Sequence, residues 1–199
     1  MKIKPQELED IVKGSSITWS SRLNAYMWKP PKGGHTLSGK NQRGDGSQKE
    51  NQEPLLWIKV PLFLYGSKSS PWIIEDNKDG IRFYADNWGM EHVRFKNSGE
   101  DCVTSYATKG IINNCIFYGD ENADKCLQLN VADKALVSNC KFYNFIRAIQ
   151  FGLKKYSARN HSATATNNLF ENCSTAILAV EMKLEESGNI LNGAKIIRQ

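Results

Sequence analysis

The sequence predicts an all-β protein, a single-stranded right-handed parallel β-helix that follows a short N-terminal helix or irregular arm. From about residue 55 onward, two kinds of short apolar run alternate, with no helical pattern between them. One run ends in a phenylalanine after small polar residues. Intervals of about 22 to 28 residues separate these phenylalanines, which is typical of stacked repeats. They are Phe95, Phe117, Phe142 and Phe170.

The second run supports the same fold, because its members align on a small residue followed by an apolar one. The five pairs are Gly80-Ile81, Cys102-Val103, Cys126-Leu127, Ala148-Ile149 and Ala176-Ile177. If these runs stack in register, equivalent residues on successive coils lie about 4.8 Å apart. A leucine-rich solenoid is disfavoured, since its Leu and Asn signature is absent.

The chain divides into an N-terminal helix and polar arm, residues 1–54, and the β-helix domain, residues 55–199. Residues 4–13 predict a short amphipathic helix, because Pro5 suits a first turn and Gly14 suits a C-terminal stop. We expect an irregular strand over residues 16–31. Residues 29–54 are almost wholly Gly, Pro, polar and charged, so they predict a long loop.

Composition limits the functions that the chain can have. Its 199 residues carry a formal net charge of +5, which favours an anionic partner. The basic residues are dispersed among acids, which disfavours nucleic acid, and no stretch approaches the roughly 18 apolar residues of a membrane span. We therefore expect that the chain binds neither nucleic acid nor membrane. We also expect a monomer.

Several other residues are expected to have structural roles. The five cysteines lie in apolar runs without C-x-x-C spacing, so we expect small buried core residues. Three asparagines, each three residues before a repeat phenylalanine, predict a stacked asparagine ladder. Three tryptophans border the early coils and are expected to pack, although a tryptophan on a groove could stack on a sugar ring. These residues are Asn114, Asn139, Asn167, Trp57, Trp72 and Trp88.

The residue before each small-apolar pair forms a charged column. Its members are Asp79, Asp101, Lys125, Arg147 and Thr175. We place this column outside, because unpaired charges in a narrow core would be very costly. Carboxylates on adjacent coils, with Glu100 beside Asp101, would repel unless a hard cation lay among them, and Ca²⁺ is the natural candidate. Such a column suits an anionic sugar polymer, but ordinary surface salt bridges along the stack explain it equally well.

Four segments resemble, in order, the family-3 pectate lyases, which are short parallel β-helix enzymes that cleave polygalacturonate. They are GDGSQKENQEP (44–54), SPWIIEDNKDGIRFYADN (70–87), VRFKNSGEDCVT (93–104) and NADKCLQLN (122–130). The likeness covers roughly residues 44–152. It implies a secreted protein that binds Ca²⁺ through Asp79, Glu100 and Asp101. It also implies that Lys125 acts at the reacting sugar, as base or as substrate clamp.

The resemblance also implies substrate contacts, and here the chain departs from the family. Where the family has a lysine and, three residues later, an arginine, this chain has Arg147 and Gln150. Gln150 cannot bind a carboxylate bidentately as arginine does. Gln128 belongs to the Asp-Lys-x-x-Gln run and is a further candidate. Arg82 replaces a family histidine and could supply the missing charge, although an unpaired surface arginine is the simpler expectation.

The predicted activity is Ca²⁺-dependent β-elimination on polygalacturonate. Removing the proton beside the sugar carboxylate places charge there, which Ca²⁺ and a guanidinium would stabilise. Lys125 as base needs a lowered pKa, which Arg147 would favour and the carboxylates would oppose. Arg147 is the second candidate base and the first candidate clamp. Two alternatives stay open: a degenerate β-helix that binds the polymer without cleaving it, and a structural β-helix of an adhesin or tail spike.

Overall fold

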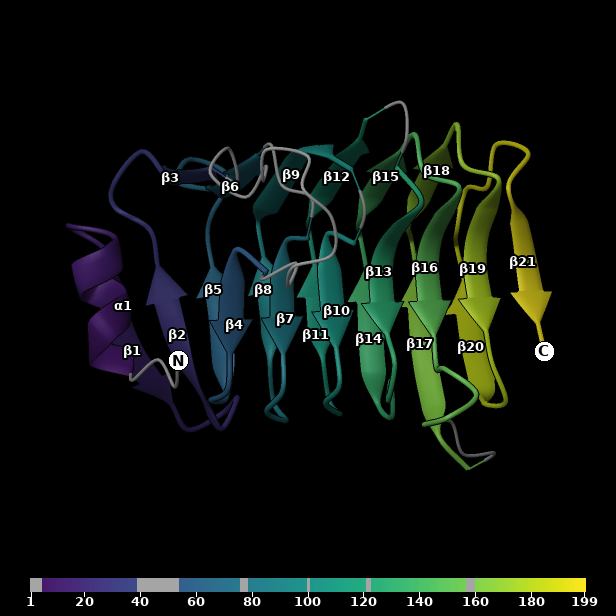
Figure 1. The fold of residues 1–199 in the computed structure, drawn as a ribbon, viewed down its shortest axis with the longest axis horizontal. Coiled ribbons are helices and arrows are strands. Elements are labelled where there is room, and N and C mark those ends of the chain that lie inside the picture. Colours follow the sequence, from purple (N-terminus) through teal and green to yellow (C-terminus); the bar gives the residue numbers. More distant parts are fainter. Residues whose placement is uncertain (1–4, 39–53, 76–78, 100, 121–122, 157–159) are drawn as a thin grey trace, which may run out of the picture.

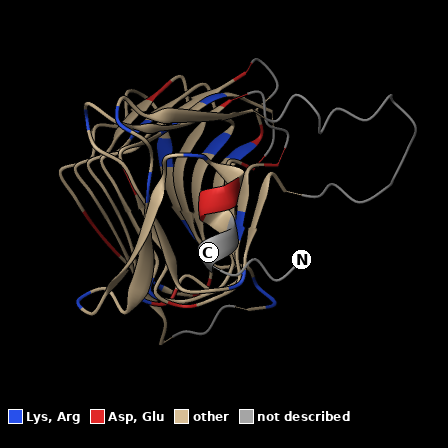
Figure 2. Ribbon diagram, turned by 90° about the vertical axis from the view of Figure 1, so that its left-hand side faces the viewer, with Lys and Arg blue, Asp and Glu red and all other residues tan. Residues whose placement is uncertain are grey.

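The predicted parallel β-helix is confirmed by the computed structural model, which describes residues 5–38, 54–75, 79–99, 101–120, 123–156 and 160–199. The chain winds through three sheets in turn, so that strands from successive coils lie side by side (Figure 1). Every strand pair is parallel except β1 with β2. The view along the axis shows the sheets as walls around the interior (Figure 2).

The strands of each sheet follow one another along the β-helix. The eight-stranded sheet contains β1 (Ser16–Ser20), β2 (Ala25–Lys29), β5 (Leu62–Tyr65), β8 (Gly89–Glu91), β11 (Ile111–Asn113), β14 (Ala135–Ser138), β17 (Ser162–Thr166) and β20 (Lys183–Ser187). The seven-stranded sheet contains β4 (Leu56–Ile58), β7 (Ile81–Phe83), β10 (Val103–Ser105), β13 (Lys125–Leu129), β16 (Arg147–Phe151), β19 (Thr175–Ala179) and β21 (Lys195–Arg198). The six-stranded sheet contains β3 (His35–Ser38), β6 (Trp72–Glu75), β9 (Val93–Ser98), β12 (Ile116–Gly119), β15 (Lys141–Tyr143) and β18 (Leu169–Glu171).

The N-terminal region begins with the predicted helix, α1 (Pro5–Ile11), which lies at one end of the β-helix (Figure 1). The prediction of a single irregular strand over residues 16–31 is wrong, because β1 and β2 form an antiparallel pair. The loop predicted for residues 29–54 is also interrupted, since β3 pairs with β6, and residues 39–53 lie outside the described residues. Pairing of β2 with β5 and of β3 with β6 satisfies backbone groups that would otherwise lie at exposed strand edges.

The repeat phenylalanines form a column inside the six-stranded sheet, as their spacing predicts. Phe95, Phe117, Phe142 and Phe170 are fully buried. Successive rings stack with centroids 5.1, 4.9 and 5.1 Å apart. Each stacked pair contributes about 0.5–1.5 kcal/mol beyond the area that it buries. This inner phenylalanine column is therefore a main source of stability.

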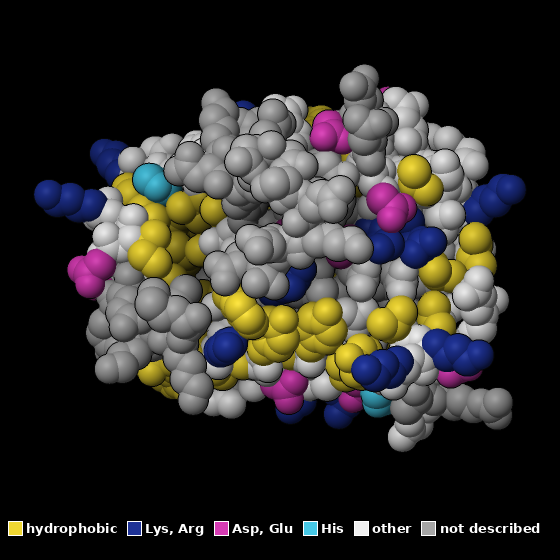
Figure 3. Space-filling model, viewed as in Figure 1, with side chains coloured by type: hydrophobic (Ala, Val, Ile, Leu, Met, Phe, Trp, Pro, Cys, Tyr) yellow, Lys and Arg dark blue, Asp and Glu magenta, His cyan; other side chains and the backbone are white. Residues whose placement is uncertain are grey.

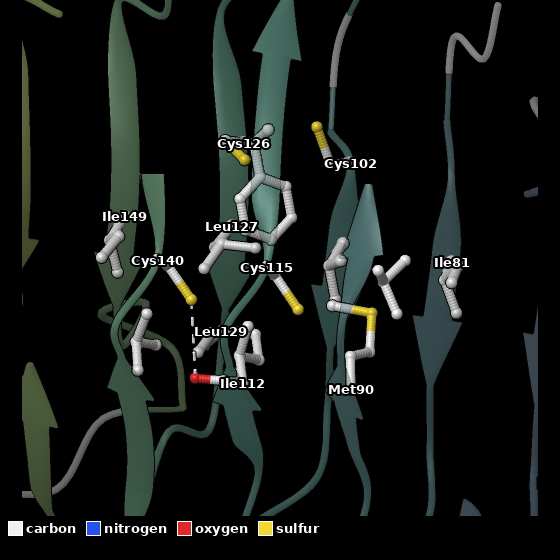
Figure 4. Close-up of a cluster of buried hydrophobic side chains, with 14 of the residues drawn as sticks. Ile81, Met90, Cys102, Ile112, Cys115, Cys126, Leu127, Leu129, Cys140 and Ile149 are labelled. Atoms are coloured by element: carbon white, nitrogen blue, oxygen red, sulfur yellow. Dashed lines mark hydrogen bonds between the residues drawn. The ribbon is translucent and has the colours of Figure 1, made fainter. Parts of the chain in front are cut away.

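The five cysteines are buried and free, which confirms the prediction that they are small core residues. Cys102, Cys115, Cys126 and Cys140 lie among the aliphatic side chains of the interior (Figure 4). Burial raises the pKa values of the Cys115 and Cys126 thiols well above their ordinary range.

The predicted column of asparagines is confirmed in its position, and the backbone conformation gives its physical basis. Asn114, Asn139 and Asn167 occupy equivalent corners between the eight-stranded and six-stranded sheets, with φ of 53°, 54° and 56°. Asparagine is one of the few non-glycine residues that adopt this left-handed conformation readily. The side chains do not bond to one another along the column: Asn139 Nδ2, for example, donates to Asn113 Oδ1 at 2.9 Å. The corner conformation explains why asparagine recurs.

Helices are almost absent from the described ranges. None of them is long and apolar enough to span a bilayer.

Candidate functional site

The candidate site lies on the outer face of the seven-stranded sheet, where the predicted register of the second run is confirmed. Ile81 pairs with Val103, Val103 with Leu127, and Leu127 with Ile149. Ile149 pairs in turn with Ile177. The charged residues two positions earlier therefore lie on successive coils, as the alignment predicts.

A bend in each strand explains how these charged residues reach the outside. In a straight strand, residues two apart point to the same face, so Lys125 would point inward with Leu127. Instead Cys126 and Leu127 are both buried, and Lys125 and Gln128 are both half-buried on the outer face. The small residue of each pair fits at this bend. The result is two outward side chains per coil, three residues apart.

In the N-terminal coils, these outward residues pair with each other. Arg82 NH2 forms an ion pair with Asp79 Oδ2, and Asp79 is only 4% exposed. Partial burial lowers the pKa of Arg82, but attraction to the Asp79 carboxylate outweighs this effect and holds the pKa above its ordinary value. The expectation of an unpaired surface Arg82 is therefore wrong. On the next coil, Thr104 Oγ1 donates to Asp101 Oδ2 at 3.3 Å.

Two of the three predicted Ca²⁺ ligands lie among the described residues. Asp79 and Asp101 lie on adjacent coils, because Gly80 N donates to Asp101 O at 2.9 Å, whereas Glu100 lies outside the described residues. In the described part of the chain, no group of three or more His, Cys, Asp or Glu residues could hold a metal ion. The Arg82 guanidinium pairs with one oxygen, Oδ2, of the Asp79 carboxylate.

The C-terminal coils present cations instead. Lys125 and Arg147 are direct neighbours in β13 and β16. The Lys125 side chain is 30% exposed, and its Nζ lies 3.7 Å from Asp124 Oδ2. Two cations of the predicted site thus lie about one strand spacing apart on the same face.

Gln150 holds Arg147 in place. Arg147 NH1 donates to Gln150 Oε1 at 2.7 Å, and Gln150 Nε2 donates to Gly152 O at 3.0 Å. Gln150 is 5% exposed, so both ends of its amide are used within the protein. The structure therefore makes Gln150 a positioning residue for Arg147. Gln128 is half-buried, and its Nε2 donates to Asn130 Oδ1 at 3.2 Å.

The predicted site residues omit an aromatic cluster on the same face. We call Trp57, Tyr84, Tyr106 and Tyr156 the aromatic row, because their rings contact one another in this order. Figure 3 shows hydrophobic side chains gathered beside Lys and Arg side chains on one face of the molecule. Tyr84 and Tyr106 each follow the last residue of an aligned strand, so the repeat alignment could have predicted that they lie on neighbouring coils. Trp72 and Trp88 are buried, as their predicted packing role requires.

Comparison with known proteins does not assign the chain to a family. No family model, no curated protein and no solved structure matches the chain, so the resemblance to pectate lyases stays a prediction.

Proposed function

We propose that the outer face of the seven-stranded sheet binds an acidic polysaccharide of the polygalacturonate class, and that Lys125 and Arg147 cleave it by β-elimination. The observation that carries this proposal is the pair of neighbouring cations on β13 and β16, one of them held in place by Gln150. A held guanidinium is well suited to a sugar carboxylate, because less side-chain entropy is lost when it binds.

In the proposed reaction, a sugar carboxylate binds the Arg147 guanidinium. The neutral Lys125 amine removes the proton from the carbon that carries this carboxylate, and the carboxylate takes up the developing negative charge. The electron pair then forms a carbon–carbon double bond as the bond to the glycosidic oxygen breaks, and water protonates the leaving oxygen. Arg147 stabilises the charge where it develops, which is the main requirement of such a transition state.

Ca²⁺ dependence remains a separate prediction. To bind the ion with Glu100 and Asp101, Asp79 would have to exchange its Arg82 partner for the metal. The proposed roles of Lys125 and Arg147 do not depend on that exchange, so a chelator tests the metal independently of the base.

A second candidate function is binding without cleavage. Gln150 favours it, because this residue is neutral where the resemblance implies a second guanidinium. Its amide is also already hydrogen-bonded to Arg147 and Gly152. Such a face would hold the polymer but stabilise the transition state poorly.

The test is the rise in ultraviolet absorbance of unsaturated products when the full chain is incubated with polygalacturonate, with added Ca²⁺ and with a chelator. The proposal expects product formation that Lys125→Ala reduces by about 10²–10⁴-fold, the range for loss of a general base. Lys141→Ala is the matched control, because Lys141 is an exposed lysine on the six-stranded sheet. Binding without product would support the second candidate, and neither binding nor product would leave only a structural β-helix.

A further inference from the structure

The aromatic row is a continuous structure across the first coils of the β-helix. The Trp57 and Tyr84 ring centroids lie 5.7 Å apart, and the Tyr84 and Tyr106 rings stack at 5.1 Å. Tyr156, from the segment after β16, meets Tyr106 edge-on at 6.0 Å. A residue of a later coil thus returns to contact an earlier one.

The row belongs to the same face as the cations. Trp57 is the direct neighbour of Arg82 on the adjacent strand. Tyr84 N donates to Ile58 O, and Tyr106 N donates to Phe83 O, both at 2.9 Å, so the two tyrosines continue β7 and β10. The row and the charged column therefore run side by side along the β-helix.

Exposure distinguishes this row from the inner phenylalanine column. Tyr84 and Tyr156 are 38% and 37% exposed, whereas the four phenylalanines are fully buried. The mutual stack covers one face of Tyr84 and one face of Tyr106, and the exposed part of Tyr84 remains for a partner. Aromatic surface with a polar end is typical of binding sites, where it gives contact area at low entropic cost.

A lysine contacts the aromatic residue at each end of the row. Lys59 Nζ lies 4.3 Å from the Trp57 ring centroid, and Lys155 Nζ lies 5.4 Å from that of Tyr156. Burial, followed by the neighbouring Tyr84, raises the pKa of Tyr106.

We propose that the aromatic row is a second binding site for the same acidic polysaccharide, occupied by sugar units beyond the one held at Lys125 and Arg147. This inference rests on the proposed function. Edges and hydroxyl groups of the row would contact the sugar rings, while Lys59 and Lys155 attract their carboxylates. The strands β4 and β16 are four strand spacings apart, or about 19 Å, which only a chain of several sugar units can span.

The experiment measures binding of digalacturonate and octagalacturonate to the full chain by calorimetry, in chelator so that turnover is minimised. We expect octagalacturonate to bind at least tenfold more tightly than digalacturonate. Tyr84→Ala should remove most of that advantage while leaving digalacturonate binding unchanged. Tyr118→Ala is the matched control, because Tyr118 is 42% exposed and stacks on Tyr143 over the six-stranded sheet. If Tyr84→Ala does not fold, Tyr156→Ala tests the same row from outside the sheets.

The outcomes separate the inference from the proposed function. If octagalacturonate binds wild type and the row variants equally, the second site is wrong and the function stands. A fully methyl-esterified octamer is the second probe. If the row variants lose its binding while acidic oligomers bind no better than the ester, the row binds sugar and the acidic-polymer function is wrong. If no oligomer binds wild type either in chelator or with added Ca²⁺, both proposals are wrong.

Discussion

The inner phenylalanine column and the outer charged column are built by the same coil repeat, yet only the inner column keeps one residue type from coil to coil. Inside, the same residue type recurs on four coils, from Phe95 to Phe170, because each ring packs on the one before it. Outside, the column changes from acid at Asp79 and Asp101 to cation at Lys125 and Arg147. The repeat fixes where these residues lie, and packing constrains only the inner ones.

Truncating the inner column should have the largest effect on stability. Phe142→Ala removes a fully buried ring between two stacked neighbours, so we expect a loss of about 3–5 kcal/mol in the free energy of unfolding. Urea denaturation measures this loss. Tyr143→Ala, the adjacent residue on the outer side, should cost less than about 1 kcal/mol. Equal losses in the two variants would contradict the division between the columns.

The ion pair in the outer column gives the next largest effect. Arg82→Ala removes the cation that pairs with the buried Asp79 carboxylate, and breaking a buried pair costs about 3–5 kcal/mol. We expect the lower end of that range, because the Arg82 side chain is 28% exposed to water. The change also removes a cation beside Asp79, so added Ca²⁺ should raise the melting temperature of this variant more than that of wild type.

Arg94→Ala is the control for this variant, because Arg94 lies on the six-stranded sheet, away from Asp79 and Asp101. A Ca²⁺ response of wild type as large as that of Arg82→Ala would show that Arg82 does not compete with the metal. No response in either chain would contradict the prediction of Ca²⁺ at Asp79, Glu100 and Asp101.

The sequence predicted the stacking and the alignment of the columns, because a repeat that buries one apolar residue per coil leaves little freedom in register. It did not predict the contacts within each coil. In a straight strand, Asp79 and Arg82 are three residues apart and point to opposite faces. Only the bend at Gly80 brings them together, and an equivalent bend at Ala148 pairs Arg147 with Gln150.

The N-terminal arm was predicted less well for a related reason. Strand β3 (His35–Ser38) has weak apolar alternation, and it becomes a strand because β6 offers it an unpaired edge. Tertiary pairing of this kind overrides local composition.

The positioning role of Gln150 predicts a smaller effect. Gln150→Ala removes the acceptor of Arg147 and the donor to Gly152, so we expect a loss of about 1–2 kcal/mol in the free energy of unfolding. Octagalacturonate binding should also weaken several-fold, because Arg147 then loses its fixed orientation. Gln150→Glu keeps an acceptor for Arg147 but not the donor to Gly152, so it should recover only part of the stability. It should not recover the binding, since its charge opposes a carboxylate ligand.

The smallest predicted effect concerns the interior at alkaline pH. Burial raises the pKa of the Cys126 thiol in the folded protein. The neutral thiol therefore contributes its full stability at pH values below the ordinary thiol pKa, and this contribution is lost as the pH rises above that pKa. With an ordinary pKa of about 8.5, ionisation in the unfolded chain should cost about 1 kcal/mol per thiol by pH 9.5. Urea denaturation from pH 7 to 9.5 should show a shallower decline for Cys126→Ala than for wild type. Parallel declines would mean that Cys126 ionises as readily inside the β-helix as in water, which its complete burial argues against. At high pH the proposed lyase would therefore lose stability, because the stacked interior that positions Lys125 and Arg147 contains these buried thiols.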